Sequence, residues 1–388
     1  GGGGVTMTLG AVGGRRRLSG RKEGAGERAR RLTRALYYAT LEALLDAETK
    51  RLGTAAHGPL LAKAEFHQGL LCCCAEAVLK AHALVAPAYP RLLALFETQA
   101  LDMFKVLEPF VRACPGPLPP TLRAHLREVS DQLLERRVWG EGSPVFRLLE
   151  EQRAAGPWPP APLGPDYERD HPDLPRTAAR ALAAAAQDKD PAAELPAERR
   201  PPRDAARTKG LEFLFRKLLV VVAKRLHHLG ARRLRLSPDL RNQVWTAVKY
   251  CLAEHVTILR NRHLDQVLLC SVYSICKVNK AEPEVTFRAI IETYKAAHAK
   301  TTRIQVIKEI PLDPRSSNPA NRRGDIIKFY NKVYIRKMKT FVLQFQRKAE
   351  QARAVAAVAT PAAAAERARQ VQQRGGGGEQ GEGGGGRG

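Results

Sequence analysis

Residues 261–278 read NRHLDQVLLCSVYSICKV, and this stretch decides the fold. Over His263–Lys277, apolar side chains occupy almost the whole circumference of a helix with 3.6 residues per turn. A helix that is apolar all round is buried on several sides, whereas a surface helix keeps one polar face. We therefore expect this helix to lie at the centre of a helical domain.

Helical periodicity continues on both sides of this central helix. Upstream, Ser237 followed by Pro238 predicts a helix start, because serine caps helices and proline is tolerated in the first turn. Downstream, Asp325 is expected to cap the last helix after an irregular stretch over residues 311–324. The helices expected around the centre cover residues 211–229, the segment from Ser237 through Trp245 and Tyr250, residues 285–297 and residues 326–345.

A second helical block occupies the N-terminal part of the chain. Its first helix is indicated by Leu41, Leu44, Leu45 and Leu52, which repeat at helical spacing. Thr121 is expected to cap its fourth helix. The helices expected in this block start near Leu32 and then cover residues 66–84, 92–113 and 121–139. No segment shows the alternation of a strand, so the fold class is predicted to be all-α.

Segments poor in large apolar residues separate and flank the two blocks. Between Gly156 and Pro202 lie 11 of the 26 prolines, and such a segment cannot bury a core. The predicted organisation is a disordered Gly/Arg-rich tail, a helical domain, a disordered linker, a second helical domain and a second disordered tail. These five parts are expected over residues 1–30, 31–150, 151–207, 208–346 and 347–388.

The charge balance favours acidic partners. The 388 residues include 64 Lys and Arg against 39 Asp and Glu, a formal net charge of +25. Such a chain attracts nucleic acid, acidic peptides or anionic surfaces, although basic tails that only aid solubility produce the same balance. No run of 18 apolar residues is present and the N-terminus lacks an apolar stretch, so neither a membrane span nor a secretory signal is expected.

The sequence lacks the motifs of common catalytic and metal sites. It contains no GxxxxGK[ST], HExxH or GxSxG, and its Gly-rich runs occur only at the termini. Cys270 and Cys276 have the wrong spacing for metal ligands on one helix. The seven cysteines form no CxxC pair, and this odd number predicts reduced thiols in the nucleus or cytoplasm. We expect no enzymatic activity, no cofactor and no metal.

Two strings of the second block carry a family resemblance. Residues 261–278 and the string RGDIIKFYNKVYIRKMK over residues 323–339 resemble the B-box of the retinoblastoma pocket-protein family, in the version of its retinoblastoma-like and plant retinoblastoma-related members. The first block resembles the A-box more loosely, through Leu36-Tyr37-Tyr38, Phe66-His67, the string FKVLEPF from Phe104, and Trp139 with Ser143-Pro144. The resemblance covers residues 31–150 and 208–346, and it implies two cyclin-like helical domains.

The chain departs from the family pattern at its start. A complete A-box has a further helical lobe before the Leu36-Tyr37-Tyr38 helix, where this sequence has only a Gly/Arg tail. The expectation is therefore an N-terminally incomplete pocket A. Together with the start at Gly1 instead of Met, it indicates a fragment, an incomplete gene model or a reduced family member.

Helical spacing places several candidate binding residues on two faces. Cys270, Tyr273 and Lys277 are spaced i, i+3, i+7, and Ile327, Tyr330, Asn331 and Tyr334 are spaced i, i+3, i+4, i+7. Faces of this kind also arise from ordinary core packing, but Asn331 is costly to bury without partners. The resemblance implies a cleft for LxCxE-motif peptides. Its residues would be Cys270, Tyr273, Lys277, Phe287, Arg288, Ile327, Tyr330, Asn331 and Lys339, with Arg288 and Lys339 at a basic rim.

The resemblance implies a second site between the two blocks. It would hold the activation peptide of the heterodimeric transcription factors that drive S-phase entry. Its residues would be Lys105, Glu108, Val111 and Arg112 from the first block and Phe213, Arg216 and Lys217 from the second. Agreement with the family weakens at Ala124, Arg127 and Ser130, where other charges are usual, so we expect weaker binding here than in a complete member. Exposed helix faces also carry pairs such as Arg216 and Lys217.

The function implied is a nuclear, non-enzymatic corepressor scaffold that restrains the cell cycle. Its partners would be S-phase transcription factors, LxCxE-containing chromatin modifiers and cyclin-dependent kinases as regulators, with DNA reached only through partners. The Ser/Thr-Pro sites are few, at Ser143, Ser237 and Thr360. The alternatives are a cyclin-like or general-transcription-factor-like module that binds DNA or a kinase, and a degenerate family member or non-functional fragment.

Overall fold

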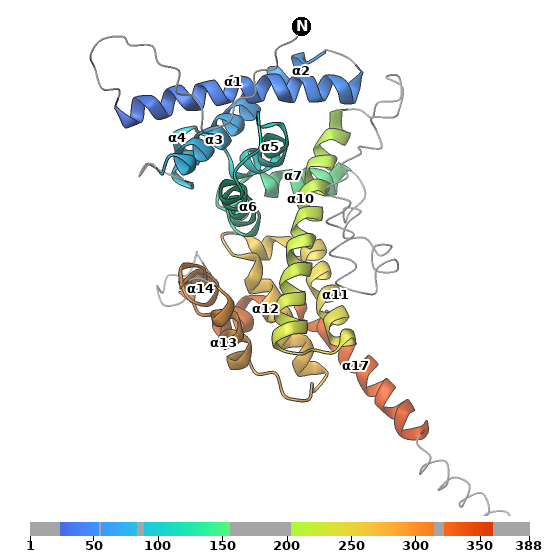
Figure 1. Ribbon diagram of the computed structural model, residues 1–388. Coiled ribbons are helices and arrows are strands. Elements are labelled where there is room, and N and C mark those ends of the chain that lie inside the picture. The colour runs from blue at the N-terminus through green and yellow to red at the C-terminus, as the bar shows by residue number, and fades with distance from the viewer. Residues whose placement is uncertain are drawn as a thin grey trace, which may run out of the picture.

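The computed structural model describes residues 24–53, 56–83, 89–155, 203–298, 300–313 and 322–359. Across these ranges the regular secondary structure is helical, apart from one short antiparallel ladder that pairs β1, Ile310–Pro311, with β2, Arg323–Gly324. Figure 1 shows two helical bodies that stack along the length of the molecule. The all-α prediction is confirmed. Most of the predicted linker and large parts of both predicted tails lie outside the described residues.

The N-terminal domain is built around α3 and α5. Its elements are α1 (Ala25–Leu52), α2 (Gly58–Leu61), α3 (Ala64–Ala81), α4 (Arg91–Leu95), α5 (Ala100–Ala113), α6 (Pro120–Glu135), the 3₁₀ turn η1 (Arg137–Trp139) and α7 (Pro144–Ala155). Gly69 lets α3 approach α5 closely, because a Cβ there would lie 3.2 Å from the Asp102 carbonyl oxygen. In Figure 1, α1 lies across the outer end of this domain.

The C-terminal domain surrounds α12, as the sequence predicted. Its elements are α10 (Arg203–Leu226), η4 (His227–Arg233), α11 (Pro238–Glu254), η5 (Val256–Leu259), α12 (Leu264–Val278), α13 (Phe287–Ala297), α14 (Lys300–Ile307), the β1–β2 ladder, α16 (Ile326–Phe329), η6 (Tyr330–Tyr334) and α17 (Ile335–Ala359). Of the 15 residues of α12, 12 are buried. The helix starts with a capping box, in which the His263 ring and the Gln266 side chain each accept a backbone N–H.

The helix boundaries correct several sequence expectations. α1 begins at Ala25 and α17 continues to Ala359, so helix replaces part of both predicted tails, because Ala, Glu, Gln and Arg are strong helix formers. α7 extends to Ala155 and α10 starts at Arg203, which shortens the predicted linker from both ends. Thr121 does not cap α6, which begins at Pro120 without a side-chain cap.

Two predicted continuous helices are interrupted in the structure. The helix predicted over residues 92–113 is divided into α4 and α5, because Glu97 between them takes a positive φ of 50°. The helix capped by Asp325 is present, but it widens into a π-helical turn, η6, over Tyr330–Tyr334. Such π turns occur often at functional sites, and no periodicity in the sequence indicated this one.

α10 joins the two domains in space. It belongs to the C-terminal block, yet it packs against α6 and α7 of the N-terminal domain, and Figure 1 shows it running from one body into the other. The Trp139 ring lies 6.4 Å from that of Phe215 on α10, and the Asn261 N–H donates to the Trp139 carbonyl at 2.8 Å. In the described part of the chain, no helix has both the length and the apolar character needed to cross a bilayer.

Candidate peptide-binding surfaces

Three aromatic side chains from three helices meet on the C-terminal domain. The ring centroids of Tyr273 and Phe287 are 4.1 Å apart, and the Tyr330 ring meets both edge-on, at 5.1 Å and 5.5 Å. These distances and angles are typical of favourable aromatic contacts. We call Tyr273, Phe287 and Tyr330 the aromatic cluster. The structure therefore brings together three of the residues predicted for a peptide cleft.

Local features of the sequence position each ring. Tyr273 is half-buried on the largely buried helix α12, and the Lys277 ammonium lies over it, 5.5 Å from the ring centroid. Phe287 opens α13, whose first turn is capped by the Thr286 hydroxyl accepting the Ala289 N–H. Tyr330 is the first residue of the π turn η6. Its pKa is raised by burial, so its phenol keeps the proton that a hydrogen-bond donor needs.

The polar residues predicted for the cleft lie at the surface. Asn331, Lys277 and Lys339 are exposed, and Ile327 is an apolar side chain that leaves 45% of its surface uncovered. The Asn331 carboxamide forms no hydrogen bond within the described chain, so both its donor and its acceptor are available. Arg288 is exposed and pairs with Glu292 on its own helix, at 3.1 Å.

One predicted cleft residue, and one further residue of the two predicted helix faces, are part of the core instead. Cys270 was predicted to line the apolar pocket, but its side chain is fully buried and offers no surface to a ligand. Tyr334 was predicted to share the binding face, but it is also fully buried, and its hydroxyl lies 2.8 Å from the Ser271 hydroxyl. The Tyr334 ring stacks on that of Tyr330, with 5.9 Å between the centroids, so it lies on the same side of the helix but deeper in the core.

The residues predicted for the second site also come together. Glu108 on α5 pairs with Lys217 on α10 at 2.6 Å and with Arg112 on its own helix at 2.9 Å. The Lys217 ammonium lies 5.4 Å from the centroid of the Phe213 ring, which in turn contacts Phe104. Val111 and Arg216 are half-buried, and Lys105 is exposed and pairs with Asp102 at 3.4 Å. We call this surface the α5–α10 groove surface.

The neighbouring helix α6 adds little charge to this surface. Ala124 and Arg127 are exposed and Ser130 is half-buried. Farther along α6, burial raises the pKa of the Asp131 carboxyl, and the nearby Glu135 raises it further. The acidic character of α6 therefore lies toward the domain junction.

A buried ion network at the domain junction was missed by sequence reasoning. The Arg225 guanidinium on α10 pairs with Glu135 from the N-terminal domain and with Asp265 at the start of α12. The network continues through Tyr294, whose hydroxyl donates to Asp265 at 2.6 Å, and through His263, which lies 3.3 Å from Glu135. Burial alone would raise the pKa of Asp265, but Arg225 and His263 hold it below its usual value.

This network also accounts for a possible metal-ligand set. Glu135, His263 and Asp265 place one ligand atom each within 4.8 Å of one another, and all three are buried. The two terminal nitrogens of Arg225 already contact the two carboxylates. A guanidinium supplies the positive charge that these carboxylates require, so the set is explained without a metal ion.

All seven cysteines are buried and free. Burial raises the pKa of the Cys114 thiol to about 11 and that of Cys72 to about 12, so these groups stay protonated at neutral pH. Cys72 contacts Met103, with 3.5 Å between the sulfur atoms. The cysteines therefore act as small core residues.

Comparisons with known proteins agree with the two-domain architecture. The family model described as the retinoblastoma-associated protein A domain matches residues 13–149, and the model of the B domain matches residues 210–339. The two ranges correspond to the two helical bodies of Figure 1, which are cyclin-like domains.

Plant proteins are among the relatives. The chain is 27% identical to a retinoblastoma-related protein of Pilosella officinarum over 375 residues, which cover 80% of this chain and 36% of that protein. It is 27% identical to a retinoblastoma-related protein of Vitis vinifera, over 80% of this chain and 37% of the relative. For retinoblastoma-related protein 3 of Zea mays the identity is 26%, over 80% of this chain and 36% of the relative. The chain thus spans little more than a third of these relatives, and with both domain models matched in order it belongs to the retinoblastoma pocket-protein family.

Proposed function

We propose that this chain is a pocket-protein scaffold that acts as a transcriptional corepressor in the nucleus without catalytic activity of its own. It restrains the cell cycle by holding one partner at the aromatic cluster and another at the α5–α10 groove surface. The effect is one of mass action, because a scaffold that binds both partners raises the effective concentration of each partner near the other. Membership of the pocket-protein family supports this role.

The aromatic cluster carries the first part of the proposal. Tyr273, Phe287 and Tyr330 contact one another, while Asn331 beside them keeps its carboxamide free. An extended peptide can place an apolar side chain on the rings and pair its main chain with Asn331. Lys277 and Arg288 add positive charge at the edge of the cluster. The ligand we propose is an LxCxE-motif peptide of a chromatin regulator, with acidic residues on its flanks.

The test is calorimetric titration of the full chain with an LxCxE peptide that has acidic flanks. Asn331→Ala removes the main-chain partner, and a lost hydrogen bond of this kind costs about 1–3 kcal/mol, or roughly 5- to 150-fold in affinity. Gln344→Ala is the matched control, because Gln344 is an exposed carboxamide farther along the same continuous helix. Equal affinity of wild type and Asn331→Ala, with the helical content of both shown intact by circular dichroism, contradicts the assignment.

The α5–α10 groove surface carries the second part of the proposal. It combines Lys217, Arg112 and Lys105 with the half-buried Phe213, which suits an acidic peptide with apolar side chains. The proposed ligand is the activation peptide of a heterodimeric S-phase transcription factor. Because Glu108 already pairs with Lys217 and Arg112, an acidic ligand has to compete with it. This competition, together with the uncharged Ala124 and Ser130, supports an affinity lower than that of a complete family member.

Two further parts of the proposal concern control and DNA. Cyclin-dependent kinases would act at Ser/Thr-Pro sites, of which Ser237 is exposed at the start of α11 and Ser143 is half-buried and bonded to the Val138 carbonyl. Thr360 lies outside the described residues. DNA is reached through the bound transcription factor.

A further inference from the structure

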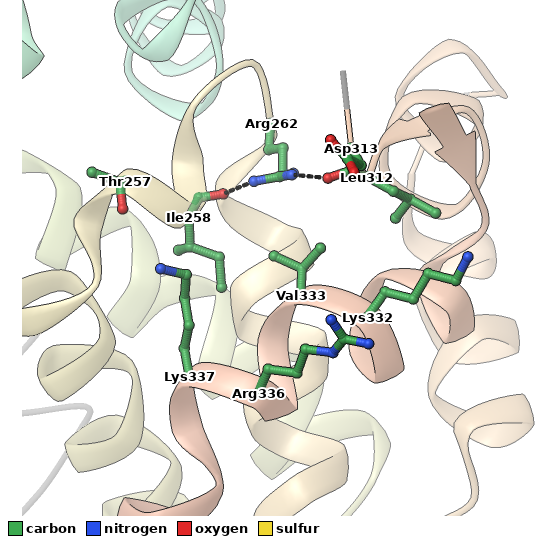
Figure 2. Close-up of a pocket in the computed structure, with 9 residues that line it drawn as sticks. All are labelled: Thr257, Ile258, Arg262, Leu312, Asp313, Lys332, Val333, Arg336 and Lys337. Atoms are coloured by element: carbon green, nitrogen blue, oxygen red, sulfur yellow. Dashed lines mark hydrogen bonds between the residues drawn. The ribbon is translucent and has the colours of Figure 1, made fainter. Parts of the chain in front are cut away.

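A basic pocket opens on the C-terminal domain at the junction of three segments. Its volume is about 550 Å³, and Figure 2 shows side chains of η6 and α17 extending toward η5 and the end of β1. Its lining consists of Thr257, Ile258, Arg262, Leu312, Asp313, Lys332, Val333, Arg336 and Lys337. Four of these side chains are cationic and one is a carboxylate, which leaves three formal positive charges around the pocket.

This pocket is separate from the aromatic cluster. None of its lining residues belongs to the proposed LxCxE site, although both involve the helix that runs through η6 into α17. On that helix Val333, Arg336 and Lys337 are spaced i, i+3, i+4 and share one face. Asn331 lies on a different face, because it precedes Val333 by two residues and residues two apart on a helix do not share a face. The basic pocket and the proposed LxCxE site therefore lie on different sides of one helix.

Arg262 forms the inner wall of the pocket and has an uncompensated charge. Its guanidinium donates to three neutral acceptors, the backbone carbonyls of Pro311 at 2.7 Å and of Ile258 and Leu312 at 3.0 Å each. No carboxylate forms an ion pair with it in the described part of the chain. Desolvation lowers its pKa to about 10. Arg262 is half-buried, and its guanidinium also lies over the Phe329 ring, 5.5 Å from the centroid. A cation held by carbonyl dipoles and a ring, without a carboxylate, gains more from a bound anion than a paired one does.

Arg336 and Lys337 face Arg262 across the pocket, as Figure 2 shows. Both side chains are exposed, and neither forms an ion pair with a carboxylate of the described ranges. Burial lowers the pKa of the nearby His255, and the charge of Lys337 lowers it further. Asp313 is the single acid of the lining and lies at its exposed edge. The electrostatic potential in the pocket is therefore positive from two sides.

We propose that this pocket binds a phosphate monoester as its dianion. Two guanidinium and two ammonium groups in one lining match the several acceptor oxygens of a phosphoryl group better than the two of a carboxylate. The Thr257 hydroxyl offers a further hydrogen bond. The volume exceeds that of a phosphoryl group, so the pocket also accommodates part of the molecule that carries it. That carrier is either a small phosphate ester or a phosphorylated peptide side chain.

The experiment uses the full chain with ¹⁵N-labelled arginine and lysine. Inorganic phosphate is titrated at constant ionic strength against sodium chloride, and the Nε–Hε signals of Arg262 and Arg336 are followed. We expect saturable shifts that chloride does not produce. The affinity for inorganic phosphate should increase between about pH 6 and 8, because its dianion forms with a pKa of about 7, roughly one unit above that of a phosphate monoester. Linear shifts, equal to those in chloride, would show general screening and overturn the proposal.

Charge-reversing variants locate the site. Arg336→Glu combined with Lys337→Glu should weaken phosphate binding at least tenfold, while Lys295→Glu, an exposed charge on α13 away from the pocket, should leave it unchanged. If the double glutamate variant does not fold, Arg336→Gln combined with Lys337→Gln is titrated with phosphate in its place. Equal binding by wild type and the folded pocket variant overturns the assignment.

A peptide pair distinguishes the two sources of the phosphoryl group. A short peptide with one phosphoserine is compared with its unphosphorylated form and with O-phosphoserine alone. Tighter binding of the phosphopeptide than of O-phosphoserine identifies a peptide carrier, and equal binding identifies a small ester. A short DNA duplex is the last probe. If it binds wild type as tightly as the phosphopeptide does, and binds the pocket variant equally well, the chain binds polyanions in general and not at this pocket, which overturns the proposal.

Discussion

The aromatic cluster and the α5–α10 groove surface are assembled in opposite ways. The cluster lies wholly within the C-terminal domain and is held by ring contacts between α12, α13 and η6. The groove surface exists only where the two domains meet, and an ion pair between Glu108 and Lys217 bridges it. One site is therefore as stable as a single domain, whereas the other depends on how the two domains dock.

The difference extends to the forces involved. Aromatic contacts are short-ranged and nearly independent of salt, while partly exposed ion pairs are screened by it. The domain junction has its own buried support, the network of Arg225 with Glu135 and Asp265, which lies along α10 from the groove surface. Damage to this network should affect the groove surface strongly and the cluster weakly.

The largest expected effect comes from Arg225→Ala. It leaves two buried carboxylates without their cation, and breaking a buried pair in this way costs about 3–5 kcal/mol of unfolding free energy. Denaturant unfolding followed by circular dichroism measures the loss. The exposed neighbour Lys224→Ala should change stability by no more than about 0.5 kcal/mol.

The same variant separates the two sites. In its folded form Arg225→Ala should bind the LxCxE peptide with an affinity within about twofold of wild type, since distant sites contribute independently. Binding of the acidic activation peptide should fall, because the docking of α10 against α6 is loosened. Equal loss at both sites would mean that the cluster also depends on domain docking.

A second test concerns the charge of the groove surface. Lys217→Glu places a carboxylate beside Glu108, so an acidic activation peptide loses an attractive partner and gains a repulsive one. We expect a loss of about 1.5–3 kcal/mol in binding, or roughly tenfold to a hundredfold. Titrations at two ionic strengths measure it, and the wild-type affinity should decrease with salt. Lys80→Glu, an exposed lysine of α3, is the control.

If the affinity for the acidic activation peptide changes neither with salt nor with Lys217→Glu, Arg216 and Lys217 belong to an ordinary solvated helix face. The LxCxE peptide serves as the internal reference in these titrations. Its affinity should not respond to Lys217→Glu, because Lys217 contacts only groups of the domain junction in the described structure.

The smallest expected effect concerns the support of the aromatic cluster. Tyr334→Phe removes a buried hydroxyl that lies 2.8 Å from the Ser271 hydroxyl, while the ring and its packing remain. Ser271 still donates to the Val267 carbonyl, so the cost should be about 0.5–1.5 kcal/mol of stability. Thermal unfolding measures it, with Tyr38→Phe, a tyrosine 63% exposed, as the control. An effect on stability larger than that of Arg225→Ala would reverse the ranking of the two supports.

Much of the fold could be predicted because helical signals are local. The apolar circumference of α12, the Ser237 cap of α11 and the Asp325 cap of α16 all appear in the structure as the sequence indicated. The errors lie where local propensity and packing disagree. α17 continues beyond Phe345 although it has no further aromatic residues, and Thr121 lies within the first turn of α6 and does not cap it.

The sequence by itself determined the helical class, the family and which residues share a helix face, since periodicity and motif strings need only neighbours along the chain. Only the tertiary structure decided which of those faces stay open. It buried Cys270 and Tyr334, left Asn331 at the surface, and joined Arg225 to Glu135, 90 residues away, and to Asp265, 40 residues away. It also placed Arg262 opposite Arg336 across a basic pocket. The physical reason is that burial and charge pairing depend on distances in space, which a pattern of neighbours does not contain.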